Sequence, residues 1–166
     1  RGRVCRADVD TPAAAGASGT LLLDPDSITI IDGMGGSADG SLPIFTAVGV
    51  TTIGELALEG QATNVELVAA DDIVLADLTD GLLDMFGLAT GESFTLRTTG
   101  SGSIIFTDVT DEIRTNGADI ILEANGTGDL ILGDVTTDGG SFTGGDITLT
   151  ALGGDVTLNG VVQSGD

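Results

Sequence analysis

Short apolar triplets recur along this chain at a nearly constant interval, and this repeat restricts the possible folds more than any other feature. Each triplet follows Asp, Ser or Asn, and the triplets come in pairs, such as "DIIL" (119–122) with "DLIL" (129–132). First members of the pairs begin at Val65, Phe94, Ile120 and Ile147, and second members at Ile73, Ile104, Leu130 and Val156. Successive members of each series are 26 to 31 residues apart, which indicates an internal structural repeat.

A third series of apolar residues follows the second series. Its members are Leu78, Val109, Val135 and Val161. Three short segments per repeat, separated by Gly, Asp and Asn that favour tight turns, are typical of strands bent at corners. One such coil cannot bury its own apolar face, whereas stacked coils pair each strand in parallel with its equivalent and form continuous aliphatic ladders. The sequence therefore predicts an all-β protein, a parallel β-helix (β-solenoid) with three short strands per coil of about 26 residues.

Alternation within the strands predicts which side chains face the core. The inward set is Val65, Leu67, Phe94, Leu96, Ile120, Leu122, Ile147 and Leu149 in the first strands, and Ile73, Leu75, Ile104, Phe106, Leu130, Leu132, Val156 and Leu158 in the second strands. Val74, Ile105 and Ile131 fall on the outward side of the second strands, where water is expected. Three interpretations are open for this outer stripe: a partner-contact surface, a face covered by another segment, or residues that simply favour strands.

The charge balance limits the classes of partner. The chain carries 26 acidic residues against five basic ones, with no His, and its net charge is −21. Nucleic acid is excluded as a partner because phosphate binding needs a basic face. Such a surface attracts cations.

The same composition argues against catalysis. The chain has neither Lys nor His for acid–base work, and Arg97 and Arg114 stand alone in the sequence. The prediction is a protein that is not an enzyme. The alternative is a carbohydrate-active β-helix enzyme, a polysaccharide lyase or glycosidase, because such enzymes share the architecture and use paired carboxylates or an Arg base.

One acidic column is a candidate cation site. Asp77, Asp108 and Asp134 each follow the second strand of successive coils by two residues. If stacked, their carboxylates repel one another, and a calcium ion with oxygen ligands would relieve the repulsion. The alternative is that each Asp accepts hydrogen bonds from the backbone of its own turn. No other cofactor is required, and residues 144–161 lack the Gly and Asp positions of the glycine-rich calcium-binding nonapeptide.

Residues 79–92, "TDGLLDMFGLATGE", lengthen one coil. Asp80 is positioned to cap a helical turn in this segment. Its apolar residues either fold back over the second sheet or project as a binding knob, in which case Leu83 and Phe86 join the outer stripe as partner-contact residues.

The start of the chain shows no repeat. Residues 1–18 are predicted to be a linker or N-terminal arm, and residues 19–166 the parallel β-helix domain. Cys5 has no second cysteine to pair with inside the chain, so a free thiol and an intermolecular disulfide are both open.

Several stretches carry a resemblance to a known family. "GTLLLDPDSITI" (19–30), "NVELVAADDIVLADL" (64–78) and "GGDITLTALGGDVTLNG" (144–160) resemble the filamentous-haemagglutinin-like exoproteins of Gram-negative bacteria, which are exported by two-partner secretion. The resemblance implies a right-handed parallel β-helix, an extracellular or cell-surface location and an outer-membrane secretion partner. It also implies a role as the shaft of a surface fibre or adhesin, with a cell-surface or polysaccharide ligand.

The last coil suggests how such a shaft is extended. The sequence stops at "VVQSGD", in the third strand of a coil, with no polar capping segment after it. Uncapped solenoid coils favour the addition of further strands. We therefore expect stacking of copies into a head-to-tail homopolymer or fibre, with a covalent array of coils as the alternative.

Overall fold

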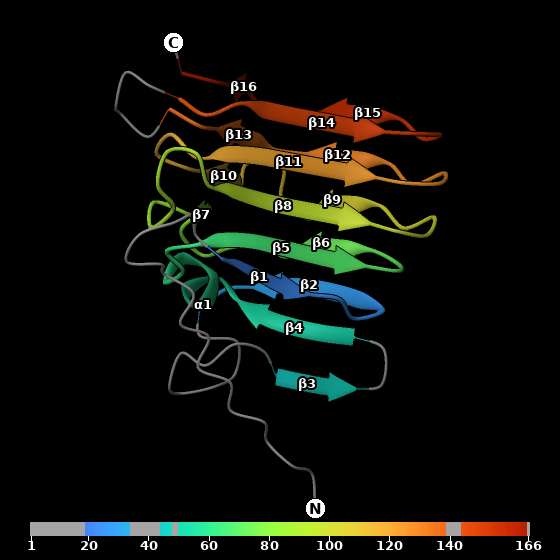
Figure 1. The fold of residues 1–166 in the computed structure, drawn as a ribbon. Coiled ribbons are helices and arrows are strands. Elements are labelled where there is room, and N and C mark those ends of the chain that lie inside the picture. The colour runs from blue at the N-terminus through green and yellow to red at the C-terminus, as the bar shows by residue number, and fades with distance from the viewer. Residues whose placement is uncertain (1–18, 34–43, 48–49, 139–143, 166) are drawn as a thin grey trace, which may run out of the picture.

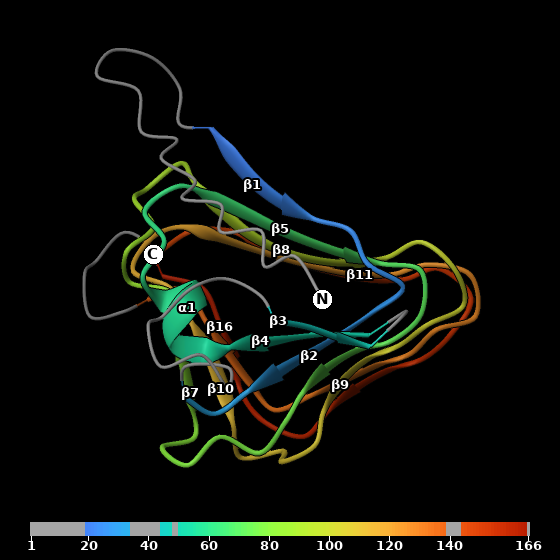
Figure 2. The same ribbon diagram turned by 90° about the horizontal axis from the view of Figure 1, so that it is seen from below.

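A computed structural model describes residues 19–33, 44–47, 50–138 and 144–165. The chain forms a parallel β-solenoid of about four turns with about 27 residues per turn, as predicted. Figure 1 shows the coils stacked one on another from the N-terminal to the C-terminal end. Viewed along the stack, three sheets enclose a core of roughly triangular cross-section (Figure 2).

The strands fall into three sheets. The first sheet contains, in spatial order, β1 (Thr20–Leu23), β5 (Asn64–Ala69), β8 (Ser93–Thr98), β11 (Asp119–Ala124) and β14 (Ile147–Ala151). The second contains β15 (Val156–Leu158), β12 (Leu130–Leu132), β9 (Ile104–Phe106), β6 (Ile73–Leu75), β2 (Ser27–Ile31), β4 (Val50–Gly54) and β3 (Ile44–Ala47). The third contains β16 (Val162–Gln163), β13 (Asp134–Thr136), β10 (Glu112–Arg114) and β7 (Leu82–Asp84).

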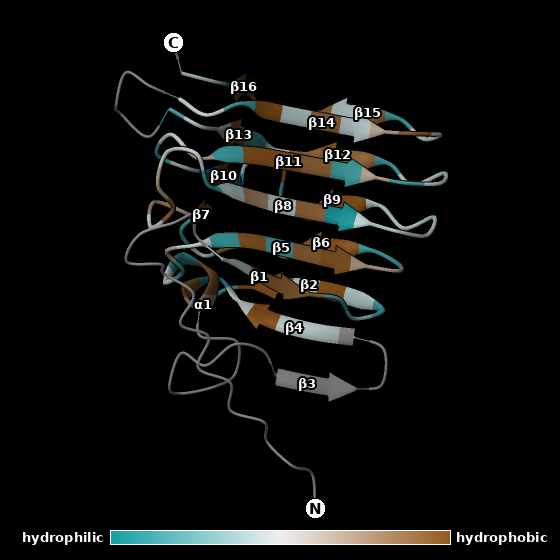
Figure 3. Cartoon of the chain, viewed as in Figure 1, coloured by the Kyte–Doolittle hydropathy of each residue, from teal (hydrophilic) through white to brown (hydrophobic). Residues whose placement is uncertain are grey.

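The register of the first two sheets confirms the predicted columns. Ile120 pairs with Phe94 and Ile147 in the first sheet. Leu130 pairs with Ile104 and Val156 in the second sheet. Figure 3 shows the apolar residues along these strands in every coil.

The predicted inward side chains line the core, with a gradient towards the last coil. Those contributed by β5, β6, β8, β9, β11 and β12 are all buried. In the last coil, Ile147 and Leu149 are only partly buried, and Val156 and Leu158 are 44% and 47% exposed. These four side chains continue the ladders but have no described coil stacked above them.

The predicted third column is correct in one coil and wrong in the others. Aligned residues of the third sheet are Leu83, Ile113, Val135 and Val162, which are 30, 22 and 27 residues apart. Of the predicted members only Val135 is among them. The corner between the second and third strands ranges from Gly133 alone to residues 76–81, so a fixed offset from the second strand could not locate the third strand.

Residues 79–92 form the third strand of their coil rather than a helical turn over the second sheet. The carboxylate of Asp80 accepts the Leu82 N–H at 3.2 Å, which fixes a turn directly before β7. Leu83, Met85 and Leu88 are buried in the core. The apolar character of this segment therefore reflects its place in the solenoid wall.

The N-terminal end of the stack contains elements that the repeat did not predict. β4 pairs in parallel with β2, and β3 pairs antiparallel with β4. β4 leads directly into the short helix α1 (Glu55–Glu59), which packs against β7 at the end of the third sheet. The Glu59 carboxylate accepts the Asp84 N–H of β7 at 2.8 Å, so α1 satisfies a donor of that strand. Ala57 and Leu58 are buried at this junction.

The corner between the first and second sheets requires glycine because the backbones of successive coils touch there. A Cβ on Gly128 would lie 1.8 Å from the carbonyl oxygen of Gly102 in the coil beneath. A Cβ on Gly154 would lie 2.2 Å from the carbonyl oxygen of Gly128. Stacked glycines thus let the coils approach to strand-pairing distance at this corner.

The β-solenoid begins within the first described residues, at β1. Residues 1–18, with Cys5, and most of the loop at 31–43 lie outside the described residues. The predicted division at residue 18 therefore stays a prediction.

Candidate functional site

The three aspartates of the predicted calcium site are not aligned in one column. Asp134 is the first residue of β13 and lies in register with Glu112 of β10, not with Asp108. Asp108 instead belongs to the preceding corner, where its carboxylate accepts the N–H and the hydroxyl of Thr110, both at 2.9 Å. These hydrogen bonds hold the pKa of Asp108 below its usual range. Within the described ranges, no group of three or more Asp, Glu, Cys or His side chains is arranged to hold a metal ion.

Polar residues directly before the second strand bind backbone donors of the next coil, whereas Asp108 binds its own turn, as the alternative interpretation expected. At the corner before the second strand, the side-chain oxygens of Asp72, Ser103 and Asp129 accept the N–H groups of Ser103, Asp129 and Asp155 at 2.8, 3.0 and 2.8 Å. Ser103 and Asp129 therefore each donate to the coil beneath and accept from the coil above. We call this series the corner ladder.

A second, shorter series precedes the first sheet. Asn64 accepts the Ser93 N–H at 2.9 Å, and Asp119 accepts the Asp146 N–H at 2.8 Å. The carboxylate of Asp134 similarly accepts the Val161 N–H at 2.6 Å. The Asp, Ser and Asn that precede the apolar triplets were visible in the sequence, and their spacing was the signal that could have revealed this role.

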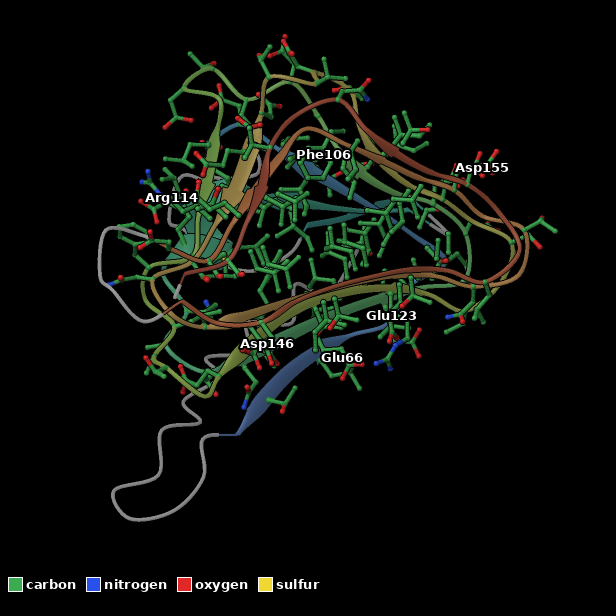
Figure 4. All side chains as sticks on the ribbon, turned by 90° about the horizontal axis from the view of Figure 1, so that it is seen from above. Glu66, Phe106, Arg114, Glu123, Asp146 and Asp155 are labelled. Atoms are coloured by element: carbon green, nitrogen blue, oxygen red, sulfur yellow. The ribbon has the colours of Figure 1, made fainter. Side chains whose placement is uncertain are left out.

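Two arginines connect coils on the outer surface. Arg97 forms ion pairs with Glu66 of the coil beneath at 2.8 Å and with Glu123 of the coil above at 2.6 Å. Figure 4 shows Glu66 and Glu123 on the outer side of the first sheet, whereas Phe106 points into the core. Counting from the aligned Phe94 and Ile120 places Arg97 beside Glu123, 26 residues away, but it does not reveal the bond to Glu66, 31 residues away and not its register partner.

Arg114 makes the equivalent connection in the third sheet. Its guanidinium donates to the Asp84 carboxylate at 3.0 Å and lies 4.5 Å from the centre of the Phe86 ring. Asp84 and Arg114 are partners in the register of β7 and β10. Both arginines of the described residues therefore act between coils.

The predicted contact residues divide into two groups. Leu83 is fully buried in β7, so its prediction as a partner-contact residue is wrong. Phe86 is 39% exposed beneath Arg114.

The outer stripe is aligned as expected. Val74 pairs with Ile105, and Ile105 with Ile131, on the outward side of the second sheet. All three side chains are half-buried. Partner contact by this stripe and by Phe86 stays a prediction.

An acidic cluster at the N-terminal end was not predicted. Glu55, the first residue of α1, is only 5% exposed, and its Oε1 accepts the Gly33 N–H at 3.0 Å. Burial raises the pKa of Glu55 to about 7, and the nearby carboxylates of Asp32 and Asp80 add to the rise. Burial and the Asp84 carboxylate also raise the pKa of Glu59, one helical turn further on. The repeat could not reveal this cluster because α1 lies outside it.

Asp111 is a second buried carboxyl. It is fully enclosed at the corner before β10, where it accepts the Leu78 N–H at 3.2 Å. Burial raises its pKa, with smaller contributions from the charges of Asp108 and Asp77. Its hydrogen bond spans two coils, so its role is again to hold adjacent coils together.

Comparisons with known proteins give no relative. No protein-family model matches the sequence, and no curated protein or solved structure is similar to it. Among the described residues, no helix is long and apolar enough to cross a membrane.

Proposed function

We propose that this chain is a non-enzymatic structural or adhesive β-solenoid, a segment of a secreted surface fibre of the kind that filamentous-haemagglutinin-like exoproteins form. One observation carries the proposal: adjacent coils are joined repeatedly by buried apolar ladders, by the corner ladder and by bridging arginines. Because such contacts repeat from coil to coil, more coils can be added without a new kind of interface.

The bridging arginines also support a structural role over the enzymatic alternative. A lyase of this architecture would use a free carboxylate pair or an Arg base. Arg97 is held between Glu66 and Glu123, and Arg114 is held by Asp84. Incubation with neutral and acidic polysaccharides is expected to yield neither new reducing ends nor unsaturated products. Catalytic release of either would overturn the proposal.

Stacking into a fibre is part of the proposal. Val156 and Leu158 present half-exposed apolar side chains on the face of the last described coil, and another coil placed there would bury them. We expect filaments in negative-stain images at high protein concentration. Leu158→Asp should abolish them while the protein stays folded. A wild-type chain that stays monomeric at every concentration would contradict stacking between copies.

The role of residues 1–18 in stacking can be tested by deleting them. Deletion of residues 1–18 should shorten or remove filaments if the arm joins neighbouring copies. Filaments of unchanged length would assign residues 1–18 to a linker.

The proposed location is extracellular, with an outer-membrane secretion partner. The ligand class proposed for an adhesin is a cell-surface component or polysaccharide, and its proposed contact residues are the outer stripe of the second sheet and Phe86 beside the third sheet. Binding of the purified protein to bacterial or host cells, compared with Ile105→Asp and Phe86→Asp variants, tests this surface. Equal binding by all three proteins would exclude it.

A further inference from the structure

Three segments meet at the N-terminal end of the solenoid around a single buried carboxyl group. They are the end of β2 with Asp32 and Gly33, the start of α1 with Glu55, and the corner before β7 with Thr79 and Asp80. The Glu55 Oε1 accepts the Gly33 N–H at 3.0 Å. Its Oε2 is buried and accepts no hydrogen bond from the described residues. A buried carboxylate oxygen without a donor is costly, so this atom needs an explanation.

Asp32 lies within hydrogen-bonding reach of the Glu55 carboxyl. Its Oδ2 accepts the hydroxyl of Thr79, which belongs to the following coil. As carboxylates, Asp32 and Glu55 are both acceptors, and neither can donate to the other. A proton on the Glu55 Oε2 would supply the missing donor and remove one of two adjacent negative charges.

Among the described residues, the charges around Glu55 are all negative or already paired. Asp32 faces it from β2, and Asp80 from the corner before β7. β4 contributes no charged residue. Further along α1 and β7 lie Glu59 and Asp84, and Arg114 is bound to Asp84. No described cation therefore compensates an ionised Glu55.

We propose that Glu55 is a proton-operated latch for the N-terminal end of the solenoid: protonated, it ties α1 to β2 and, through Asp32, to Thr79, and on ionisation it loosens α1. This regulation goes beyond the proposed function and does not depend on it. Loosening of α1 would uncover Ala57 and Leu58, which α1 buries at the end of the stack.

The raised pKa of Glu55 determines how the strength of the latch changes with pH. The pKa of Glu55 rises from 4.5 to about 7 when the segment is folded, so the closed form keeps its proton in a range where the open form loses it. The latch is strongest below pH 4.5, weakens as pH rises towards about 7, and changes no further above that. Within this window the opening constant of α1 is expected to rise by up to about tenfold per pH unit.

Hydrogen exchange of the intact protein tests the latch. Protection factors for the hydrogen-bonded amides of Gly33, Leu56 and Gly60, corrected for intrinsic exchange, should fall in the wild type between pH 4.5 and 7. In Glu55→Gln they should stay constant, because Gln accepts the Gly33 N–H and can donate to Asp32 at every pH. Glu112→Gln, which removes a charge from β10, should retain the wild-type pH dependence.

Two results would overturn the latch. One is a Glu55→Gln protein whose protection of α1 falls with pH as steeply as that of the wild type. The other is wild-type protection that stays constant from pH 4 to pH 8. If Glu55→Gln does not fold, Asp32→Asn provides the test, because loss of the neighbouring charge should move the midpoint of the wild-type transition to lower pH. An unmoved midpoint there would equally reject the proposal.

Discussion

Asp129 illustrates what a single side chain contributes to this solenoid. Its own N–H is bound by Ser103 of the coil beneath, and its carboxylate binds the Asp155 N–H of the coil above. The Asp155 N–H is exposed at this corner, so its hydrogen bond to the Asp129 carboxylate replaces one to water and contributes a modest net stabilisation. The side chain thus replaces a missing backbone acceptor and, by doing so, fixes the height of the next coil.

Asp129→Ala is expected to lower the free energy of unfolding by about 1 kcal/mol, because the Asp155 N–H loses its acceptor. Asp129→Asn keeps an acceptor oxygen and should lose less. Asp155→Ala is the matched control, since no described residue donates a hydrogen bond to the Asp155 carboxylate. Urea denaturation measures all three. Equal losses in Asp129→Ala and Asp155→Ala would contradict the corner ladder.

Gly128 stabilises the stack because it has no Cβ, which lets the coil beneath approach closely. Its missing Cβ would occupy the space of the Gly102 carbonyl oxygen. Gly128→Ala should therefore push the coils apart and cost about 1–3 kcal/mol of stability, as overpacking does. Thr127→Ala, at the exposed neighbouring position, should change stability by less than about 0.5 kcal/mol. A thermal melt in which the two variants coincide would show that the corner can expand freely.

Strands of one column differ in how much they stabilise the fold, although their sequences are alike. Leu132 of β12 and Leu158 of β15 are partners in the second sheet. Leu132 is fully buried, whereas Leu158 is 47% exposed on the last described coil. Burial, and not the sequence pattern, therefore determines the contribution of each strand.

Leu132→Ala is expected to cost about 2–5 kcal/mol through lost burial and the cavity left behind. Leu158→Ala should cost about 1 kcal/mol or less in the monomer, because nearly half of its surface already meets water. Chemical denaturation of the monomeric protein distinguishes the two. A loss at Leu158 as large as that at Leu132 would mean that the last coil is covered in solution.

For the whole molecule, the net charge of −21 works against the compact state through self-repulsion. Corner hydrogen bonds and arginine bridges offset part of this repulsion locally, but the described carboxylates form no metal site. Cations are expected to screen this repulsion as a diffuse atmosphere around the acidic surface.

Calcium and magnesium should raise the melting temperature by similar amounts at equal concentration, by screening. Asp108→Asn should respond in the same way as the wild type, because Asp108 binds Thr110 and is not aligned with Asp134. Differential scanning calorimetry with matched salt controls measures the effect. A calcium-specific rise in the melting temperature that disappears in Asp108→Asn would show instead that Asp108 takes part in a calcium site.

The sequence by itself determined the solenoid, the first two sheets and most of their inward residues. Val65, Phe94 and Ile120 could be aligned because each begins the same alternating apolar pattern directly after Asn, Ser or Asp. Parallel pairing of equal, alternating strands then leaves one way to bury their apolar sides.

Only the tertiary structure decided the third sheet, the partners of the polar residues and the N-terminal end. Leu83 and Ile113 belong to one column although the preceding corners differ in length, and a flexible corner absorbs such differences without a trace in the repeat. Asp134 and Asp108 share a sequence offset but not a register position, because the corner before β13 is Gly133 alone whereas residues 107–111 precede β10. Burial of Glu55 depends on β2, α1 and the corner before β7 together, and no local pattern contains all three.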